Sequence, residues 1–420
     1  MTFIITAILS AVGTPLFIVI CGIALYQFYS VDIDLTVIFI EMYRLAEMPS
    51  LSALPLFCFS GFLLANSKAP NRIVSFTKVL FGWLPGGLAI VSIVICALFT
   101  ALTGASGMTI VAMGGLLFPA LLKDNYGQSF SLGLLTTSGS LGLLFPPSLP
   151  LILFGIISET PIDQLFIAGI IPGTLLMLAL GLYGSIYVIR KGSSPPKPVQ
   201  TNISNIWREF RSSLGEIFLP IFLFVAIWGG YIAISEAAAL CVVYVFVLTT
   251  IIHREVKLSL FPKICVESMV LFGAIFVILA SAVAYTNFLV DQEVPNQLLN
   301  FIREHINNKW MFLLALNIFL IVVGCMIDMF SALILVVPLI LPVAQSYGIH
   351  PVHLGIIFMT NLEIGYSTPP VGLNLFISSI RFGRPIIELY RASLPFLGIL
   401  FICLLIVTYV PAISLVFIAK

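Results

Sequence analysis

Three segments decide the fold of this chain: LFTALTGASGMTIVAMGGLLFPALL (98–122), LGLLFPPSLPLILFG (141–155) and TPIDQLFIAGIIP (160–172). A second set repeats them in the same order: VGCMIDMFSALILVVPLILPVA (323–344), IGYSTPPVGLNLFIS (364–378) and RPIIELYRASLP (384–395). Prolines mark the register, with Pro119 matching Pro342, Pro146-Pro147 matching Pro369-Pro370 and Pro161 matching Pro385. The offset stays at 223 or 224 throughout, which indicates an internal duplication.

The composition is that of a polytopic membrane protein. Of the 420 residues, 60% are hydrophobic and 9% are charged, whereas soluble domains carry about 25% charged residues. Because about 20 apolar residues cross a bilayer, we expect spans at 3–28, 48–65, 129–158, 164–189, 216–234, 236–252, 268–288, 353–380 and 392–417. The first span is too long for a cleavable signal peptide and lacks a basic start. The net charge of +1 does not favour nucleic acid, and the seven cysteines lie singly, which favours core residues.

Two further apolar stretches, 87–122 and 310–343, are each predicted to form a re-entrant hairpin. Their polar tips are residues 103–107 and residues 326–331. Arms of roughly 15 residues on either side are too short to cross a hydrocarbon layer of about 30 Å at 1.5 Å per residue. Both tips are therefore expected near the middle of the bilayer, where irregular backbone is tolerated only inside protein or beside a wet cavity.

The distribution of basic residues predicts the side that each loop faces. With a cytoplasmic N-terminus, fifteen of the 19 Lys and Arg residues lie on the cytoplasmic side, and the others are Arg44, Arg303, Lys309 and Lys420. The first hairpin then enters from the cytoplasm and the second from the periplasm, so the halves are inverted repeats. Charge alone does not distinguish a hairpin from two full crossings, so that argument depends on the tips.

The expected fold is an all-α polytopic membrane protein with inverted repeats, two re-entrant hairpins and two broken helices. The expected organisation is scaffold helices (1–86), a first transport-core repeat (87–190), a cytoplasmic loop with a surface helix (191–215), further scaffold helices (216–309) and a second transport-core repeat (310–420). Segments 32–47 and 294–307 are amphipathic and are expected at the membrane surface.

Each repeat contains a proline pair flanked by Gly and by Ser or Thr, and each pair is predicted to break a helix. Residues 141–148 read LGLLFPPS, and residues 365–372 read GYSTPPVG. Proline lacks an amide donor, so carbonyl groups are left facing a cavity. Such oxygens, without competing charge, suit a weakly held monovalent cation such as Na⁺. The half-helix after each pair points its positive N-terminal end at the same place, which suits an acid group.

Two acidic side chains fall at membrane depth, where a carboxylate costs about 2.5–3.5 kcal/mol on insertion scales. Asp328, in the second tip, is the better candidate for a cation ligand, although an Asp at this place also caps helices well. For Glu363, before the second proline pair, the sequence leaves open a structural partner, a protonated buried acid or a functional role.

These motifs resemble the large membrane subunit of the tripartite ATP-independent periplasmic (TRAP) transporters. The resemblance covers nearly the whole chain and is carried by LGLLFPPS (141–148) with Leu153-Phe154-Gly155, by NLEIGYSTPPVGLNLF (361–376) and by Glu236-Ala237-Ala238-Ala239. It implies a sodium-coupled elevator carrier of the bacterial inner membrane, not an enzyme, that imports an organic acid anion such as a C4-dicarboxylate, a sugar acid or sialic acid. It also implies two separate partners, a small four-helix membrane subunit and a soluble periplasmic substrate-binding protein.

The resemblance also implies where the ligands lie, with one Na⁺ site between the first tip and the first break and another between Asp328 and the second break. The expected Na⁺ ligands are Thr103, Gly104, Ser106, Gly142, Phe145, Met326, Asp328, Gly365 and Thr368. The substrate is expected between the tips, in contact with Ser106, Ser148, Thr368 and Asn374. No organic cofactor is implied. The first tip departs from the family's Ser-Gly-Ser-Ser at Ala105, which excludes a side-chain ligand there, and Phe145 replaces an isoleucine.

Two alternatives share some of these features. A stand-alone sodium-coupled anion carrier of the wider ion-transporter group would have the same hairpins but no binding protein. An intramembrane serine protease would explain Gly104-Ala105-Ser106-Gly107, which matches a GxSG motif, but it needs a histidine at membrane depth. The four histidines lie at span ends or in loops: His253, His305, His350 and His353. A protease also leaves the duplication unexplained, and a passive channel is disfavoured because re-entrant arms in inverted repeats suit alternating access.

Overall fold

The computed structural model describes residues 16–82, 84–190, 203–306 and 308–418, and its regular elements in these ranges are all helices. The first part of the chain forms α2 (Leu16–Ser30), α3 (Thr36–Ala46), the 3₁₀ turn η1 (Pro49–Ser52), α4 (Ala53–Ala65) and α5 (Ala69–Phe81). The start of the first predicted span (3–15) and most of the predicted cytoplasmic loop (191–202) lie outside the described residues.

The first repeat has the predicted order of hairpin, broken helix and long helix. These elements are α6 (Gly87–Thr103), α7 (Ser106–Lys123), α8 (Gln128–Ser138), the 3₁₀ turn η2 (Leu141–Leu144), α9 (Leu149–Ser158) and α10 (Ile162–Arg190). The second repeat follows the same order with α15 (Lys309–Met326), α16 (Met329–Ser346), α17 (Pro351–Gly365), α18 (Leu373–Phe382), α19 (Ile386–Tyr409) and the short α20 (Ala412–Leu415). The all-helical fold with two hairpins and two broken helices is confirmed.

Between the repeats lie α11 (Ile203–Trp228), α12 (Ile234–Phe246) with the π turn η3 (Val247–Ile252), the 3₁₀ turn η4 (Leu258–Leu260), α13 (Phe261–Asp291) and α14 (Val294–His305). The surface helix expected at 206–214 and the span expected from 216 form a single helix, α11. Its first turns are polar and its remainder is apolar, so one continuous helix combines the expected surface segment with the expected span. The amphipathic segments expected at 32–47 and 294–307 form α3 and α14.

Among the described residues, eight helices are long and apolar enough to cross a membrane, or up to ten if each of two bent pairs is counted as one span. The hairpin arms are longer than expected, with 17 residues in α6 and 18 in each of α7, α15 and α16. The arms are longer because the helices continue beyond the apolar runs into polar ends such as Lys123 and Ser346. A helix of eighteen residues is about 27 Å long, close to the thickness of the hydrocarbon layer. The length of the arms therefore does not by itself show that the hairpins are re-entrant. The burial of the first tip inside the protein supports a re-entrant first hairpin.

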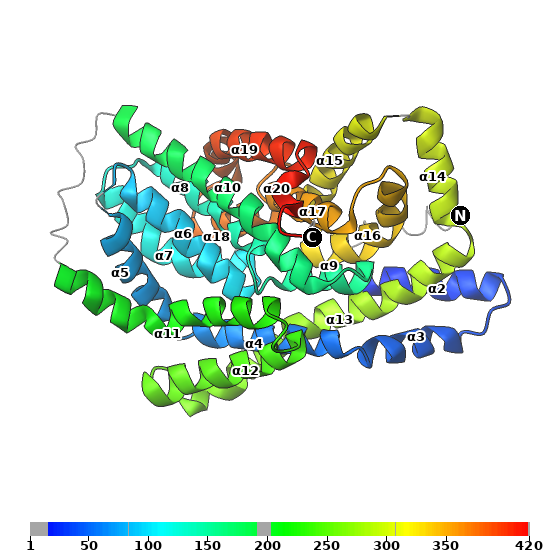
Figure 1. The fold of residues 1–420 in the computed structure, drawn as a ribbon, viewed down its shortest axis with the longest axis horizontal. Coiled ribbons are helices and arrows are strands. Elements are labelled where there is room, and N and C mark those ends of the chain that lie inside the picture. The colour runs from blue at the N-terminus through cyan, green and yellow to red at the C-terminus, as the bar shows by residue number, and fades with distance from the viewer. Residues whose placement is uncertain (1–15, 83, 191–202, 307, 419–420) are drawn as a thin grey trace.

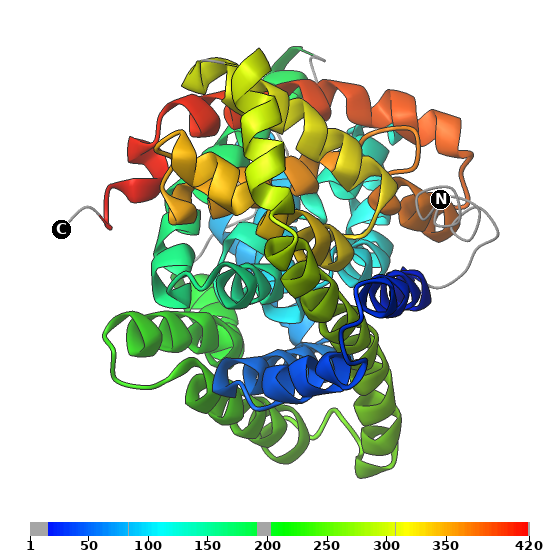
Figure 2. The same ribbon diagram turned by 90° about the vertical axis from the view of Figure 1, so that its right-hand side faces the viewer.

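Most of the scaffold helices lie along one side of the molecule and the repeats along the other, while α14 packs on α16 of the second repeat. Figure 1 shows α3, α4, α11, α12 and α13 below the hairpins and the broken helices. In Figure 2, turned by 90°, the blue α3 and the green α11 and α12 remain on the lower side, with the orange and red second repeat above. Within this scaffold α12 packs on α4, and α13 packs on α2, α3 and α4.

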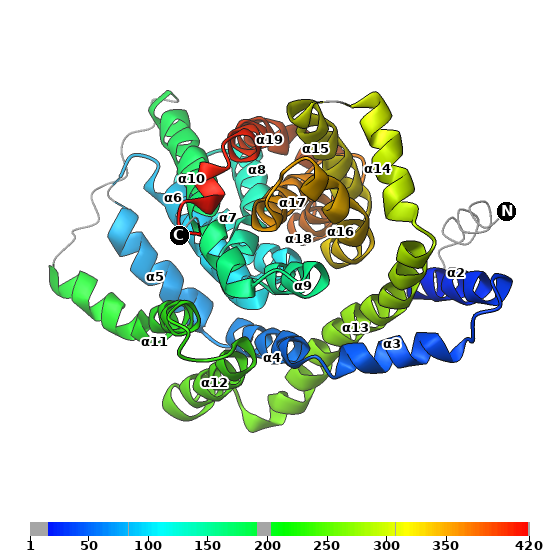
Figure 3. The same ribbon diagram turned by 45° about the vertical axis from the view of Figure 1, so that its right-hand side comes forward.

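The two repeats interlock. Each hairpin's first arm packs on its own broken helix, α6 on η2 and α15 on α17, whereas the second arm crosses to the other repeat, α16 on α9 and α7 on α18. The helices α8 and α19 pair across the repeats, as do α10 and α17. Figure 3 shows the second-repeat helices α15 to α18 beside α8 and α9 of the first repeat. The halves therefore form one body, which we call the core.

The broken helices meet at positions that the duplication relates. The Ser140 hydroxyl donates a hydrogen bond of 3.4 Å to the Glu363 carbonyl, and the two residues differ by the repeat offset of 223. A contact between equivalent residues lies on the pseudo-twofold axis that relates the halves. The axis therefore passes through the middle of the core, between α17 and the turn that follows α8.

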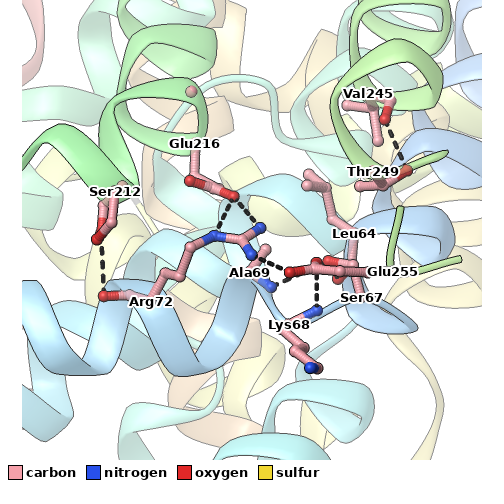
Figure 4. A network of polar contacts seen from close by, with 12 residues as sticks. Leu64, Ser67, Lys68, Ala69, Arg72, Ser212, Glu216, Val245, Thr249 and Glu255 are labelled. Atoms are coloured by element: carbon pink, nitrogen blue, oxygen red, sulfur yellow. Dashed lines mark hydrogen bonds and ion pairs between the residues drawn. The ribbon is translucent and has the colours of Figure 1, made fainter. Parts of the chain in front are cut away.

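An ion-pair network joins α5, the helix before the first hairpin, to α11 and to the loop after η3 (Figure 4). Arg72 of α5 donates to Glu216 of α11 and to Glu255, while the Lys68 amide donates to the other Glu255 oxygen at 2.9 Å. The side chain of Glu216 is fully buried and that of Arg72 is 14% exposed. Partial burial works to raise the pKa of Glu255, but the hydrogen bonds from Arg72 and the Lys68 amide outweigh it and hold that pKa below its usual value.

Candidate functional site

The first hairpin tip is a buried turn of two residues. Gly104 ends α6 with a φ of +67°, a conformation that glycine adopts without strain, and Ala105 is extended before α7 begins at Ser106. Thr103 is fully buried and its hydroxyl donates to the Phe99 carbonyl at 2.9 Å. The hydroxyl oxygens of Thr103 and Ser106 keep lone pairs that can accept or coordinate.

The first tip lies against the first break, as the resemblance implies. A Cβ added to Gly104 would stand 2.4 Å from the Leu149 side chain, and one added to Gly142 would stand 2.2 Å from the Ala97 carbonyl oxygen. The Gly142 carbonyl accepts from the Phe145 amide at 3.0 Å. The Phe145 ring packs where a side chain at Gly173 would lie, so the phenylalanine is accommodated by a glycine of α10.

Proline pairs form both breaks, and the Pro146-Pro147 and Pro369-Pro370 bonds are cis. After the first pair, the Ser148 side chain caps α9 by accepting from the Leu151 amide at 3.4 Å. In the second break the half-buried Thr368 donates its hydroxyl to the Ile364 carbonyl at 2.8 Å.

The second tip carries the acid that the first tip lacks. Asp328 caps α16, since its carboxylate accepts from the Ser331 amide at 3.0 Å and from the Ser331 hydroxyl. The helix-capping interpretation of Asp328 is therefore correct, and it leaves the other lone pairs of the carboxylate available. The Asp328 side chain is exposed, as is that of Met326, whereas Ser106 of the first tip is buried.

The second tip also lies against its own break. The Gly372 amide donates to the Cys325 carbonyl at 2.9 Å, and the Tyr366 hydroxyl accepts from the Met329 amide. Gly365 lies directly on the first arm of the hairpin, because an added Cβ would stand 2.8 Å from the Gly324 backbone. Both expected pairings of tip and break are thus present in the structure.

One hydrogen bond joins the first tip to the second repeat. The Ser106 hydroxyl donates to Asn374 Oδ1 at 2.8 Å. Asn374 is fully buried, and its amide nitrogen has no hydrogen-bond partner among the described residues. A buried amide donor without a partner is costly, which makes this nitrogen a candidate contact for an acid group.

A cavity of about 350 Å³ lies between the two tips and the scaffold. Residues 104–107, residues 328–330, Leu143 and Tyr366 line its core side. Leu271, Ala274, Ile275 and Ile278 of α13 form the scaffold wall, and Leu373 and Ile377 of α18 complete the lining. Of the predicted ligands, Gly104, Ser106 and Asp328 line this cavity. Asn374 reaches it through Ser106, and the other predicted ligands lie outside its lining: Thr103, Gly142, Phe145, Ser148, Met326, Gly365 and Thr368.

Sequence reasoning missed three features of the site. The Tyr366 hydroxyl ties the second break to the second tip, and α13 supplies one wall of the cavity. A polar chain inside the core also went unnoticed: Asn361 donates to Asn317 Oδ1 at 2.8 Å, and Asn317 donates to the Thr408 hydroxyl at 3.1 Å. An asparagine in an otherwise apolar hairpin arm is a signal that could have revealed this chain.

Glu363 is fully buried, and neither of its carboxyl oxygens has a hydrogen-bond partner among the residues described.

The serine-protease pairing is absent from the first tip, because Ser106 bonds to Asn374. The one fully enclosed histidine in the described ranges, His353, bonds instead to the Ser414 hydroxyl at 2.7 Å and the Thr408 carbonyl at 3.2 Å.

Comparison with known proteins agrees with this architecture. The family model described as "Tripartite ATP-independent periplasmic transporter, DctM component" matches residues 3–413. The fold is similar to the YdaH transporter of Alcanivorax borkumensis, with a TM-score of 0.63, 14% sequence identity and coverage of 89% of this chain and 87% of that one. At that identity the likeness supports the fold alone.

Two curated relatives are similar over most of their length. A C4-dicarboxylate TRAP transporter large permease protein of Pseudomonas aeruginosa is 35% identical over 376 residues, covering 90% of this chain and 88% of the relative. A sialic acid TRAP transporter large permease protein of Vibrio cholerae is 31% identical over 370 residues, covering 87% and 85%. On its hairpins, its broken helices and these matches, the chain belongs to the DctM component of the tripartite ATP-independent periplasmic (TRAP) transporters.

Proposed function

We propose that this chain is the large membrane subunit of a sodium-coupled symporter that imports an organic acid anion across the bacterial inner membrane. The observation that carries the proposal is the cavity between the two hairpin tips, which come from different repeats. Ser106 lines it on one side and Asp328 on the other. Family membership supports transport. The curated relatives include permeases named for C4-dicarboxylate, isethionate, ectoine and sialic acid, and an acid group is the chemistry that the first tip suits best.

The oxygen groups of the two tips and breaks would hold Na⁺. The last carbonyls of α6 and α15 lack intrahelical donors, as at any helix end, and the Thr103 and Thr368 hydroxyls keep lone pairs beside their donated bonds. Asp328 would add the only carboxylate among the residues that line the cavity. Oxygen ligands of this kind suit a hard cation rather than a transition metal that prefers nitrogen or sulfur.

An elevator movement is supported by the division into scaffold and core. The cavity lies where α13 faces both tips, so a core that slides along α13 would carry the site from one side of the membrane to the other. The remaining partners of a TRAP system would be a small four-helix membrane subunit and a periplasmic binding protein. The distribution of basic residues along the chain supports a cytoplasmic N-terminus for the proposed carrier.

Uptake by proteoliposomes tests the proposal. The vesicles would contain this chain and its small membrane subunit, and the binding protein would be added outside with a labelled acid. We expect uptake only with an inward Na⁺ gradient and only with the binding protein present. Uptake that persists when K⁺ replaces Na⁺ would contradict the coupling, and uptake without the binding protein would instead identify a stand-alone carrier.

A further inference from the structure

The residues that line the cavity between the tips differ in chemistry from one end to the other, and this difference limits which acid the cavity can hold. The inference drawn from it rests on the proposed function. Of the residues that line it, Asp328 is the only one with a carboxyl side chain, and none is Lys, Arg or His. The lining is otherwise apolar apart from Ser106 and the Tyr366 hydroxyl. The cavity therefore offers very few partners to polar groups of a solute.

One end of the cavity is suited to a single acid group. The first turn of α7 begins at Ser106 with no side-chain cap, because Ala105 precedes it. Uncapped amides at a helix N-terminus attract an anion. The buried and unpartnered amide nitrogen of Asn374, one hydrogen bond away through Ser106, is an independent sign that an acceptor belongs here.

The other end is unsuited to a second acid group. The equivalent helix, α16, is capped by Asp328, whose carboxylate takes up the Ser331 amide and hydroxyl. A negative cap offsets the positive end of the helix and repels another anion. Under the proposed function a cation at Asp328 would be a coupling ion, which leaves no cationic side chain for a second carboxylate.

The walls are suited to hydrocarbon. Leu271, Ile275 and Ile278 recur at helical spacing on one face of α13, and Leu373 and Ile377 lie one turn apart on α18. Hydroxyl groups buried against such walls would lose their hydrogen bonds to water without replacement. A solute with many hydroxyls is therefore disfavoured.

We infer that the solute of this transporter carries a single acid group and a compact hydrocarbon body, and is neither a dicarboxylate nor a polyhydroxylated sugar acid. Its carboxylate would lie at the start of α7, near Ser106 and Asn374. Its body would lie between α13 and α18.

Three probes separate these classes: 4-methylpentanoate, with one carboxylate and a branched hydrocarbon body; succinate, with two carboxylates; and gluconate, with one carboxylate and several hydroxyls. The full chain, co-purified with its small membrane subunit, would be titrated with each in NaCl while its unfolding temperature is followed. We expect half-saturation by 4-methylpentanoate at a concentration at least tenfold below that of the other two. Equal or tighter binding of succinate or gluconate would overturn the inference, as would no binding of any probe.

A pair of variants on α18 tests the wall itself. Leu373→Asn places a polar group in the lining, at a side chain that is 41% exposed. Ile380→Asn makes the matching change on the same helix outside the lining. We expect Leu373→Asn to weaken 4-methylpentanoate binding about tenfold and to narrow the difference from gluconate, with Ile380→Asn unchanged. Equal effects of the two variants would contradict the assignment of the wall.

The experiments can refute the inferred preference among the three probes and the proposed coupling to Na⁺ independently of each other. Uptake of labelled 4-methylpentanoate that ignores Na⁺ would refute the proposed coupling while leaving the binding order intact. Sodium-dependent uptake of succinate in preference to 4-methylpentanoate would do the reverse.

Discussion

At the residue scale, the two hairpin tips (103–107 and 326–330) have no residue in common at equivalent positions, and their difference in charge lies at the residue before the second arm. Residue 105 is Ala and residue 328 is Asp, and each is the residue before a descending arm. Both tips lie against their own breaks through glycine contacts, and those contacts do not involve the Asp328 side chain. The charge at Asp328 can therefore be tested without rebuilding the tip.

Replacing Asp328 by Asn should remove sodium dependence or abolish uptake while the protein still folds. Asn caps a helix about as well as Asp, so the bonds from Ser331 can be kept while the charge is lost. We expect uptake to fall at least tenfold with an unfolding temperature close to that of the wild type. Ser331→Ala is the control, because it removes a capping partner and leaves the carboxylate. Wild-type, sodium-dependent uptake by Asp328→Asn would rule out its proposed role.

The Arg72 network predicts an effect on stability. Arg72→Met should leave the fully buried Glu216 carboxylate without its partner, and breaking a buried pair from one side costs about 3 kcal/mol or more. We expect a clearly lower unfolding temperature in detergent. The double variant Arg72→Met with Glu216→Leu removes the stranded charge as well and should regain part of the loss. A double variant less stable than the single one would contradict this account.

Little of this residue detail could be read from the sequence. The motif around the second proline pair contains Tyr366 and Asn361, but neither was expected to have a structural role, because their partners come from other helices and follow only from the fold. Arg72 was predicted to lie on the cytoplasmic side, yet no spacing rule connects it with Glu216 and Glu255, which are far along the chain.

At the scale of elements, the duplication made the prediction accurate. Hairpins were expected at 87–122 and 310–343, and the structure has them at 87–123 and 309–346. A repeated break is a strong signal because both copies must satisfy the same backbone geometry. Helix ends were less predictable, since polar residues such as Lys123 and Ser346 continue a helix after its apolar run has ended. The same effect merged the expected surface helix into α11.

Gly365 should tolerate no side chain, because it is the point where α17 rests on α15. Gly365→Ala would bring a Cβ to 2.8 Å from the Gly324 backbone, which cannot give way as a side-chain tip would. We expect a loss of about 1–3 kcal/mol, the usual range for overpacking, seen as a lower unfolding temperature and reduced uptake.

Gly398→Ala is the matched control for that change. Gly398 lies within α19, and an added Cβ meets nothing within 4 Å. Alanine favours a helix over glycine by about 1 kcal/mol, so this variant should be unchanged or slightly more stable. Equal destabilisation by the two variants would show that the close approach at Gly365 is not the cause.

At the scale of the whole molecule, the prediction concerns movement of the core against the scaffold. Ile278 of α13 and Phe330 of α16 line the same cavity from opposite bodies. In a background without the native cysteines, Ile278→Cys with Phe330→Cys should be joined by a short bifunctional thiol reagent. We expect the joined protein to lose uptake and to regain it when a cleavable reagent is reduced. Unchanged uptake in fully joined protein would exclude the elevator movement, and each single cysteine variant controls for the reagent.

The meeting of Ser140 and Glu363 has a consequence for the choice of reporters. Both residues lie in the core, which the proposed elevator movement displaces as one body, so their separation should not change. Probes attached near this crossing should record a constant distance through a complete turnover, whereas probes on a hairpin tip and α13 should alternate between two. The pair thus supplies a constant reference separation inside the core, against which a displacement of the core relative to α13 can be recognised.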